Sequence, residues 1–392
     1  MACARILYVT VILVSMALDN LARRIPLLPP CDFPAIYNFG DSNSDTGGIS
    51  AAFGRIPPPY GQSFFPRPAG RASDGRLIID FIAEHLGLPY LSSYLDSIGT
   101  NFRHGANFAA GGSAIRRQNE AIFESGISPF SLDIQIVHFD GFKVRNTEIY
   151  HRARNLSDRR QGPQPQEFSR ALYTFDIGQN DLVAGFRQLS TPQLRAAIPD
   201  IVNQLAAAVT GLYERGARTF WVHNTGPIGC LPVAIAKVKD PAPGYLDENG
   251  CVKSQNDIAL QFNEELKDEI VKLRAELSDA AIVYVDMYAA KYELITNAKN
   301  QGFEDPFEIC CGYHGIGYDV WCGNKGNVNG TEVYAGSCED PSKIISWDGV
   351  HYTEAANHWI ANRIVNGSMS DPSIPITSAC HARANLSALG FF

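Results

Sequence analysis

The chain has 392 residues and 42.9 kDa, with 45% hydrophobic and 19% charged residues, so it can bury a sizeable core. Its net charge of −8 and isoelectric point near 5.6 disfavour a nucleic-acid backbone or an anionic membrane surface as partner. Composition therefore predicts an acidic globular protein, and no internal repeat or linker divides it.

The N-terminal segment predicts entry into the secretory pathway. An apolar run over residues 6–18 has the length of a secretory h-region and falls short of the roughly 20 residues that span a bilayer. We expect residues 1–30 to be a signal peptide that is cleaved before Cys31. The alternative is an uncleaved signal anchor, because Arg23 and Arg24 follow the run and no small-x-small cleavage site is present. Stable membrane contact is expected only if this segment is retained.

Cysteines and glycosylation sequons agree with secretion. Cys3 would leave with the signal peptide, and the remaining eight cysteines are an even number, which fits disulfides in an oxidising compartment. Zinc binding is the competing use, but the chain has no CxxC pair. Four Asn-x-Ser/Thr sequons are candidate glycosylation sites: Asn155, Asn329, Asn366 and Asn385.

The first expected strand covers residues 36–40 and ends at Gly40 in a turn rich in Asp, Ser, Asn and Gly. Ser42 stands in this turn, and α/β enzymes place reacting groups at the carboxyl ends of buried strands. Ser42 is therefore a candidate nucleophile. The alternative is an ordinary polar turn with a capping serine.

The next segments contain one helix and two glycine- or proline-rich loops. A proline-rich stretch at 57–66 predicts a surface loop that carries aromatic side chains, and residues 77–86 predict a helix stopped by Gly87. The run 105–114 is composed of small residues, and its paired glycines would leave backbone amides open to an anion or an oxyanion. A tight packing turn is the alternative. The polar segment 116–168 predicts an insertion over the core.

Strands and long helices alternate in the second half of the chain. Strands are predicted at 171–177, 218–223 and 281–286, and helices at 191–214 and 256–277. This alternation indicates a parallel sheet with helices on both faces, built as one domain over 31–392. Asn180 lies in the turn that follows the first of these strands, where its side-chain amide is a candidate oxyanion donor.

The C-terminal part supplies a candidate acid–base pair. Residues 302–343 are rich in Gly, Cys and Asn and predict disulfide-tied loops, with His314 at the surface. Thr353 is a plausible N-cap, so Asp348 and His351 would lie just before a helix, close enough for the carboxylate to orient the imidazole. His351, Glu354 and His358 could alternatively form a metal stripe.

Five motifs follow one another in a fixed order, and no Gly-x-Ser-x-Gly elbow occurs. They are Phe39-Gly40-Asp41-Ser42-Asn43-Ser44-Asp45-Thr46-Gly47, Gly105-Ala106-Asn107-Phe108-Ala109, Gly178-Gln179-Asn180-Asp181, Gly226-Pro227-Ile228-Gly229-Cys230-Leu231-Pro232 and Asp348-Gly349-Val350-His351. The ordered set resembles the GDSL or SGNH esterase and lipase family, specifically its large secreted plant branch that includes early-nodulin-like esterases. The leucine that gives the family its name is Asn43 here, which concerns packing and pocket polarity more than catalysis.

The resemblance implies a flavodoxin-like, three-layer α/β/α fold that needs neither a metal nor an organic cofactor. It implies Ser42 as nucleophile, His351 as general base and Asp348 as the residue that orients His351. The oxyanion donors would be the amides of Ser42 and Gly112 and the side chain of Asn180, with the Gly111 amide as the alternative to Gly112.

The resulting hypothesis is a secreted serine ester hydrolase that forms an acyl-enzyme. We expect short-chain, mainly acetyl, esters of cell-wall polysaccharides or glycosides as substrates, and the cell wall or the Golgi lumen as location. The alternatives are an acyl-lipid lipase whose lid is the segment 116–168, a glycosidase that uses Asp176 and Asp181, and an inactive carbohydrate-binding or defence protein.

Overall fold

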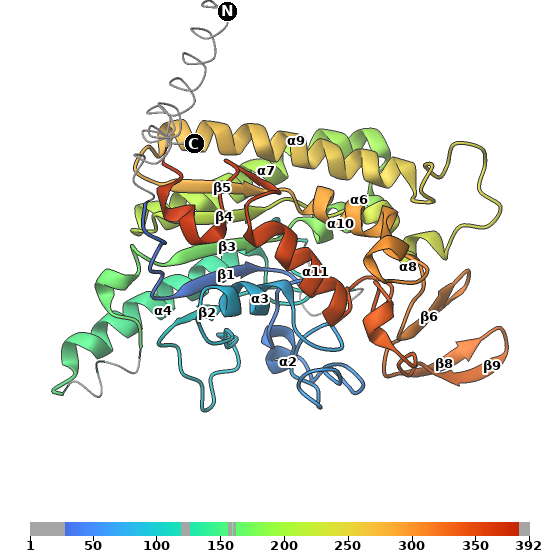
Figure 1. The fold of residues 1–392 in the computed structure, drawn as a ribbon, viewed down its shortest axis with the longest axis horizontal. Helices are drawn as coiled ribbons and strands as arrows, with labels where there is room; N and C mark the ends of the chain where they lie inside the picture. Colours follow the sequence, from blue (N-terminus) through green and yellow to red (C-terminus); the bar gives the residue numbers. More distant parts are fainter. Residues whose placement is uncertain (1–27, 119–125, 156–158, 160–161, 384–392) are drawn as a thin grey trace, which may run out of the picture.

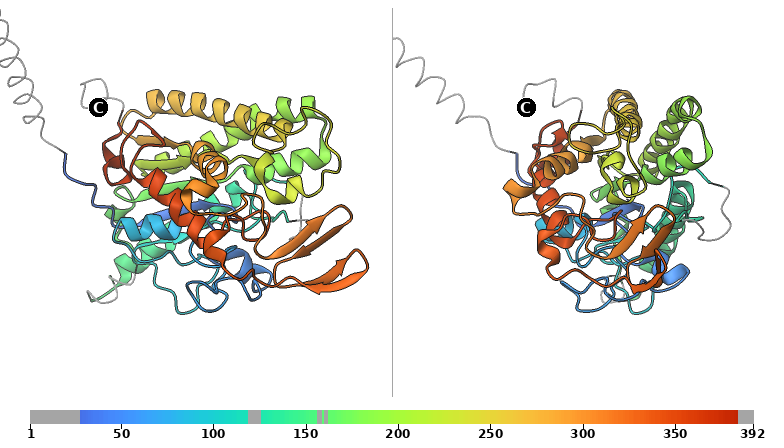
Figure 2. Two further views of the ribbon diagram at one scale, coloured as in Figure 1. Left: turned by 45° about the vertical axis from the view of Figure 1, so that its right-hand side comes forward. Right: turned by 90° about the vertical axis from the view of Figure 1, so that its right-hand side faces the viewer.

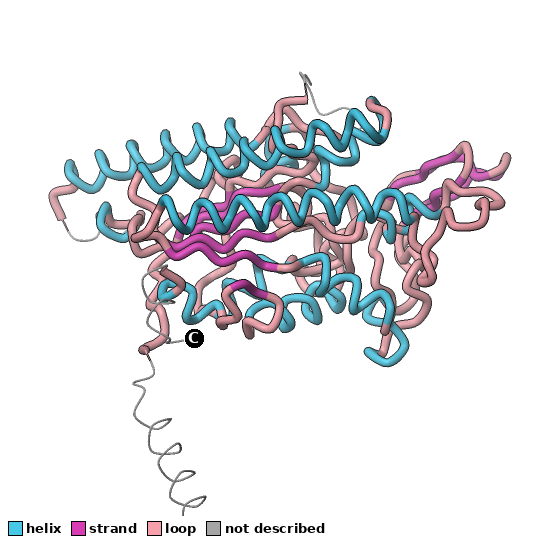
Figure 3. Tube along the Cα trace, turned by 90° about the horizontal axis from the view of Figure 1, so that it is seen from above, coloured by secondary structure: helices cyan, strands magenta, loops and turns pink. Residues whose placement is uncertain are grey.

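A computed structural model describes residues 28–118, 126–155, 159 and 162–383, which form a central sheet between two layers of helices (Figures 1 and 3). The six-stranded sheet has the order β10-β5-β4-β3-β1-β2. Its strands are β1 (Ile36–Gly40), β2 (Gly105–Asn107), β3 (Leu172–Asp176), β4 (Thr219–His223), β5 (Ala281–Val285) and β10 (Ser370–Asp371). β1 to β5 are parallel and β10 pairs antiparallel with β5. The parallel order 2-1-3-4-5 is that of flavodoxin-like sheets, which confirms the predicted fold class.

Long helices cover both faces of this sheet, as the α/β alternation predicts (Figure 3). One face packs against α4 (Leu132–Arg152), α7 (Thr191–Glu214) and α9 (Lys253–Glu276), and the other against α3 (Ile78–His85), α10 (Met287–Thr296) and α11 (Glu354–Val365). Shorter helices are α2 (Gly48–Ala52), α6 (Gln179–Gln188) and α8 (Pro232–Ile235). Short 3-10 turns occur at Pro165–Glu167, Ile228–Cys230, Ala298–Gln301, Pro341–Lys343 and Ile376–His381.

Successive side chains of a strand point to opposite faces of the sheet, so each strand contributes to the apolar core on both faces. Tyr37 and Phe39 point to the α4, α7 and α9 layer, whereas Ile36 points to the opposite layer. The Phe39 ring stacks on Phe108 and Phe175, with centroid distances of 5.3 Å to each. Burying one such side chain stabilises the fold by roughly 1.5–3 kcal/mol. β1, which ends at the Ser42 turn, is therefore packed on both faces.

The segment 116–168 differs from the predicted insertion. Its described part contains α4, a 21-residue helix whose buried face includes Ile136, Phe139 and Phe142. Val137, Val144 and Ile149 are apolar but lie on its exposed face, which is why the sequence pattern there is weak. α4 is thus part of the core.

The Cys-rich segment forms two hairpins that project beyond the carboxyl ends of the parallel strands (Figures 1 and 2). They pair β6 (Gly312–Gly315) with β7 (Tyr318–Trp321) and β8 (Lys325–Val328) with β9 (Thr331–Tyr334), where loops alone were predicted. We call residues 310–338 the hairpin lobe. Disulfides Cys310–Cys338 and Cys311–Cys322 close it, and Cys31–Cys380 and Cys230–Cys251 complete four bridges, which confirms the expected use of the eight cysteines.

The N-terminal segment and the last sequon are not tested by this structure. Residues 1–27, which hold most of the expected signal segment, and Asn385 lie outside the described residues. Among the helices that are described, none is both long enough and apolar enough to cross a membrane. The sequon asparagines Asn155, Asn329 and Asn366 are exposed, so glycosylation at these positions stays a prediction.

Candidate active site

Ser42 stands two residues after β1, at the carboxyl edge of the sheet, and is partly exposed. Gly40 ends the strand and is clamped by the side chain of Gln135 on α4. The Gly40 N–H donates to Oε1 at 2.9 Å, and Nε2 donates to the Gly40 carbonyl at 2.8 Å. A Cβ at Gly40 would lie 2.3 Å from Ser44 Oγ and 2.7 Å from the carbonyl oxygen of Asp176, so only glycine fits. The turn that carries Ser42 therefore leaves the sheet in a fixed direction.

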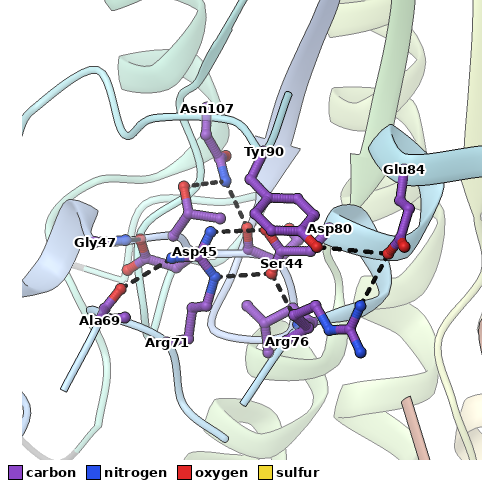
Figure 4. A network of polar contacts seen from close by, with 12 residues as sticks. Ser44, Asp45, Gly47, Ala69, Arg71, Arg76, Asp80, Glu84, Tyr90 and Asn107 are labelled. Atoms are coloured by element: carbon purple, nitrogen blue, oxygen red, sulfur yellow. Dashed lines mark hydrogen bonds and ion pairs between the residues drawn. The ribbon is translucent and has the colours of Figure 1, made fainter. Parts of the chain in front are cut away.

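Asp45, which is labelled in Figure 4, joins this turn to the glycine pair. Its Oδ1 accepts the N–H groups of Gly47, at 2.7 Å, and Gly48, and its Oδ2 accepts those of Ile49, at 3.0 Å, and Gly111, at 2.8 Å. Burial raises the pKa of this carboxyl, and the four N–H donors oppose the rise. One buried side chain thus fixes both loops that surround Ser42.

A second group of polar contacts, made by Asn107 and Arg71, supports the same turn (Figure 4). Asn107 at the end of β2 donates to the Ser44 carbonyl at 2.6 Å and to Thr46 Oγ1 at 2.9 Å. Beside it, the buried Arg71 forms two bonds of 2.7 Å with the carboxylate of Asp80, which also accepts the N-terminal N–H of Leu77 at the start of α3. The loop of Arg71 lies against Gly47, since a Cβ at Gly70 would meet Gly47 Cα at 2.5 Å.

Ser42, His351 and Asp348 form a continuous hydrogen-bonded chain, although 309 residues separate the first two. His351 Nε2 lies 2.7 Å from Ser42 Oγ, and His351 Nδ1 lies 2.7 Å from Asp348 Oδ2. A carboxylate only accepts, so Nδ1 carries the proton and Nε2 of the neutral ring accepts from the serine hydroxyl. Asp348 Oδ1 also accepts the backbone N–H groups of Val350, at 3.1 Å, and His351, at 2.8 Å. Thr353 caps α11 as predicted, with its side chain accepting from Ala356 at 3.2 Å.

The electrostatics of the pair favour an ionised Asp348 and a basic His351. Burial acts to raise the pKa of Asp348, but His351 and the hydrogen bonds to the carboxylate outweigh it and lower that pKa to about 2. Burial acts to lower the pKa of His351, but the Asp348 carboxylate outweighs it and raises that pKa. The arrangement can take a proton from Ser42 and stabilise the imidazolium that forms.

Three groups around Ser42 can donate to a developing oxyanion. The Gly111 amide already donates to Asp45, whereas the amides of Ser42 and Gly112 have no acceptor among the described residues. Gly112 has φ +76°, a conformation that favours glycine. Asn180, in the first turn of α6, donates from Nδ2 to the carbonyl of Ser113 at 2.9 Å. These contacts favour Gly112 over Gly111 as donor.

A buried group of charges lies beneath these donors. Asp41 Oδ1 accepts both the backbone and the side-chain N–H of Asn43, at 2.9 and 2.8 Å, and Asp41 Oδ2 lies 3.4 Å from Asn180 Nδ2. Asn43 therefore folds back onto Asp41. Burial and the neighbouring Asp176 carboxylate raise the pKa of Asp41 to about 7, with the buried Lys291 opposing them. Lys291 could not be found from the sequence, because nothing near it in the chain belongs to the site.

His314 and the metal stripe differ from their sequence interpretations. His314 was expected at the surface, but its side chain is fully buried, with Nδ1 2.8 Å from Asp319 Oδ1 and Nε2 3.1 Å from the Asp348 carbonyl. Glu354 pairs with Arg76 instead of approaching His351. Within the part of the chain that is described, the one set of three metal-ligating groups that converges is Cys31, Cys380 and His381, and both cysteines are in a disulfide.

The chain is similar to known proteins over most of its length. A family model described as GDSL-like Lipase/Acylhydrolase matches residues 36–364. GDSL esterase/lipase At5g14450 of Arabidopsis thaliana is 62% identical over 366 residues, covering 93% of this chain and 94% of the relative. GDSL esterase/lipase ENOD8 of Medicago truncatula is 47% identical, with 94% and 99% covered. The protein named Alpha-L-fucosidase 3 of Arabidopsis thaliana is 52% identical, with 86% and 91% covered.

Proposed function

The chain belongs to the GDSL-like lipase and acylhydrolase family and is thus a carboxylic ester hydrolase, and we propose that Ser42, His351 and Asp348 carry out its reaction through an acyl-enzyme. The proposal rests on two hydrogen bonds of 2.7 Å, one between Ser42 Oγ and His351 Nε2 and one between His351 Nδ1 and Asp348 Oδ2. No cofactor enters the proposal.

In the first step, Ser42 Oγ attacks the ester carbonyl while His351 Nε2 takes its proton. The carbonyl oxygen becomes negative and is stabilised by the amides of Ser42 and Gly112 and by Asn180 Nδ2. His351 then gives its proton to the departing alcohol oxygen, and the C–O bond to the alcohol breaks. Asp348 holds the imidazolium throughout.

In the second step, water replaces the alcohol. His351 removes a proton from the water as its oxygen attacks the acyl carbon, and the same donors stabilise the second oxyanion. Return of the proton to Ser42 Oγ breaks the acyl bond and releases the acid. The products are one alcohol and one carboxylic acid, and the enzyme is regenerated.

The test compares 4-nitrophenyl acetate hydrolysis by wild type, Ser42→Ala and the control Ser169→Ala, since Ser169 is exposed and lies before β3, outside the site. We expect Ser42→Ala to lose at least about a thousandfold in kcat and Ser169→Ala to match wild type. Equal rates for wild type and Ser42→Ala would remove the serine mechanism.

We further propose that the substrates carry short acyl groups, mainly acetyl, on cell-wall polysaccharides or glycosides. The cavity beside His351, lined by Leu231, Ile345 and Tyr352 among others, has a volume of only about 10 Å³, so this side of the imidazole offers no deep apolar tunnel for a long acyl chain. α4, the one long element in the described part of the segment 116–168, is packed on the sheet and is not available as a lid for acyl lipids.

Two substrate panels test this proposal. Acyl-chain profiling from acetyl to palmitoyl nitrophenyl esters should show highest kcat/KM at the short end, and acetate should be released from acetylated xylan or pectin. A preference for long chains, with no acetate release, would favour an acyl-lipid lipase instead.

A glycosidase is the second candidate, because a relative 52% identical to this chain is named Alpha-L-fucosidase 3. The candidate carboxylates do not favour it. Asp181 is 1% exposed and accepts the backbone N–H groups of Ile115 and Arg116, at 2.7 and 3.0 Å, and Asp176 is buried beside His223. Hydrolysis of nitrophenyl fucoside that persists in Ser42→Ala would revive this candidate. Glycan binding without any esterase activity would support a binding or defence protein.

We propose that the protein works in the secretory pathway or outside the cell. Its support is the set of four disulfides among the described residues and the exposed sequons Asn155, Asn329 and Asn366. Peptide-N-glycosidase treatment of the protein purified from a secreting host should lower its mass, and N-terminal sequencing should find a start close to Cys31.

A further inference from the structure

Asp348 is held by a side chain that lies outside the five sequence motifs. The Tyr60 hydroxyl donates to Asp348 Oδ2 at 2.8 Å, and this is the same oxygen that His351 Nδ1 approaches. The other oxygen, Oδ1, accepts the two backbone N–H groups of Val350 and His351. Four donors therefore surround the carboxylate, and Tyr60 supplies the one that comes from a different segment of the chain.

Tyr60 is built rigidly into this position. It is 8% exposed, and its ring packs edge to face on Trp347, with 5.8 Å between ring centroids. Tyr60 and Trp347 belong to the same small core as the cysteines of the hairpin lobe. The proline-rich loop is pressed against that lobe, since a Cβ at Gly323 would lie 2.5 Å from the Pro58 carbonyl oxygen. The hydroxyl thus has little freedom to leave Asp348.

We propose that Tyr60 is a positioning residue of the hydrolysis, fixing the orientation of the Asp348 carboxylate so that Oδ2 stays aimed at His351. The inference rests on the proposed function of Ser42, His351 and Asp348. Without Tyr60, the remaining contact on Oδ2 is the imidazole that the carboxylate itself has to orient, so only the two backbone N–H groups on Oδ1 would fix the carboxylate independently of that ring. The Tyr60 hydroxyl donates to Asp348, so Tyr60 acts on His351 and Ser42 through Asp348.

The bond also changes the charge that His351 senses. A hydroxyl donated to Oδ2 draws negative charge away from the oxygen that faces the imidazole, and it contributes to the low pKa of Asp348. Without it, the carboxylate would hold the imidazolium more tightly and raise the pKa of His351. The other charged or titratable groups near the pair are Asp41 and Lys291, which act on His351, and His314, which contacts the Asp348 carbonyl. The Tyr60 hydroxyl bonds to Asp348 and to none of these three residues.

The test is Tyr60→Phe, which removes the hydroxyl and keeps the ring. Tyr173→Phe is the matched control, because the Tyr173 hydroxyl is also buried and donates over 2.8 Å, but to the Phe168 carbonyl in the core. We expect Tyr60→Phe to lower kcat about tenfold, the cost of one hydrogen bond to a charged group, with KM within about twofold. The acid limb of its kcat/KM profile should move to higher pH. Tyr173→Phe should change neither quantity.

A double-mutant cycle separates positioning from packing. In an Asp348→Asn background, Tyr60→Phe should cost less than about twofold, because the group through which it acts is already altered. A kcat and pH profile equal to wild type in Tyr60→Phe, or a full tenfold loss in the Asp348→Asn background, would overturn the proposal. The kcat losses in both backgrounds are interpreted only if the hydrolysis that is measured depends on Ser42, which the Ser42→Ala variant checks. Activity that survives Ser42→Ala would instead contradict the proposed function itself.

Discussion

Replacing Asp45 by asparagine should damage both stability and catalysis, although Asp45 does not touch the reacting atoms. Asparagine offers one acceptor oxygen in place of two, and its amide would face the N–H groups of Ile49 and Gly111. Two charge-assisted hydrogen bonds are lost, at about 1.5–3 kcal/mol each, so we expect the free energy of unfolding to fall by about 3–6 kcal/mol. The freed Gly111 would also let the Gly112 amide move away from the oxyanion, lowering kcat by about a hundredfold.

Urea unfolding followed by tryptophan fluorescence measures the first effect, since Trp221 and Trp347 are fully buried reporters. The control is Asp257→Asn, which makes the same charge change in an exposed ion pair with Lys253 on α9 and should cost less than about 1 kcal/mol. If Asp45→Asn unfolds at the same urea concentration as the control and keeps wild-type kcat, Asp45 does not join the two loops as described.

Three further predictions address the site and its support. Asn180→Ala should lower kcat by about a hundred- to a thousandfold at little cost in unfolding free energy; a loss under tenfold in steady-state kinetics would remove Asn180 from the oxyanion donors. The active form needs neutral His351, and the Asp348 carboxylate raises the pKa of His351, so the acid limb of the kcat/KM profile should lie above pH 6.5. In Asp348→Asn this limb should move to lower pH. A limb that stays in place would contradict this linkage. Arg71→Met should lower the free energy of unfolding by about 3–5 kcal/mol in urea unfolding, because it leaves the buried Asp80 carboxylate without its ion-pair partner. The double variant Arg71→Met with Asp80→Leu should recover most of this loss. Equal losses in the single and double variants would argue against an uncompensated charge as the cause.

The elements of the fold could be predicted wherever local periodicity is strong. The helix predicted at 191–214 has the bounds of α7, and α9 begins three residues before the predicted helix. α4 was missed as a core element because apolar side chains also lie on its exposed face, among them Val137, Val144 and Ile149, so no clear apolar stripe marks the helix in the sequence. The hairpins of the hairpin lobe were missed because their strands have four residues each and little burial.

The candidate site could be predicted only as far as its residues lie in ordered motifs. Ser42, Asp348 and His351 stand in short turns whose composition is visible in the sequence. Tyr60 lies 288 residues from the carboxylate that it contacts, so no spacing rule connects them. His314 was misjudged for a related reason: the Asp348 carbonyl that it contacts lies 34 residues away in the chain, and its contact with Asp319 depends on a hairpin that was not predicted.

The most direct test of the central proposal is to identify the residue that an organophosphonate modifies. Wild type and Ser42→Ala would be treated with a fluorophosphonate, digested and analysed by tandem mass spectrometry, with esterase activity followed in parallel. The account predicts one phosphonyl group on the peptide that contains Ser42, in proportion to the activity lost, and no adduct in Ser42→Ala. A stoichiometric adduct on another residue, or full inactivation with Ser42 unmodified, would contradict it.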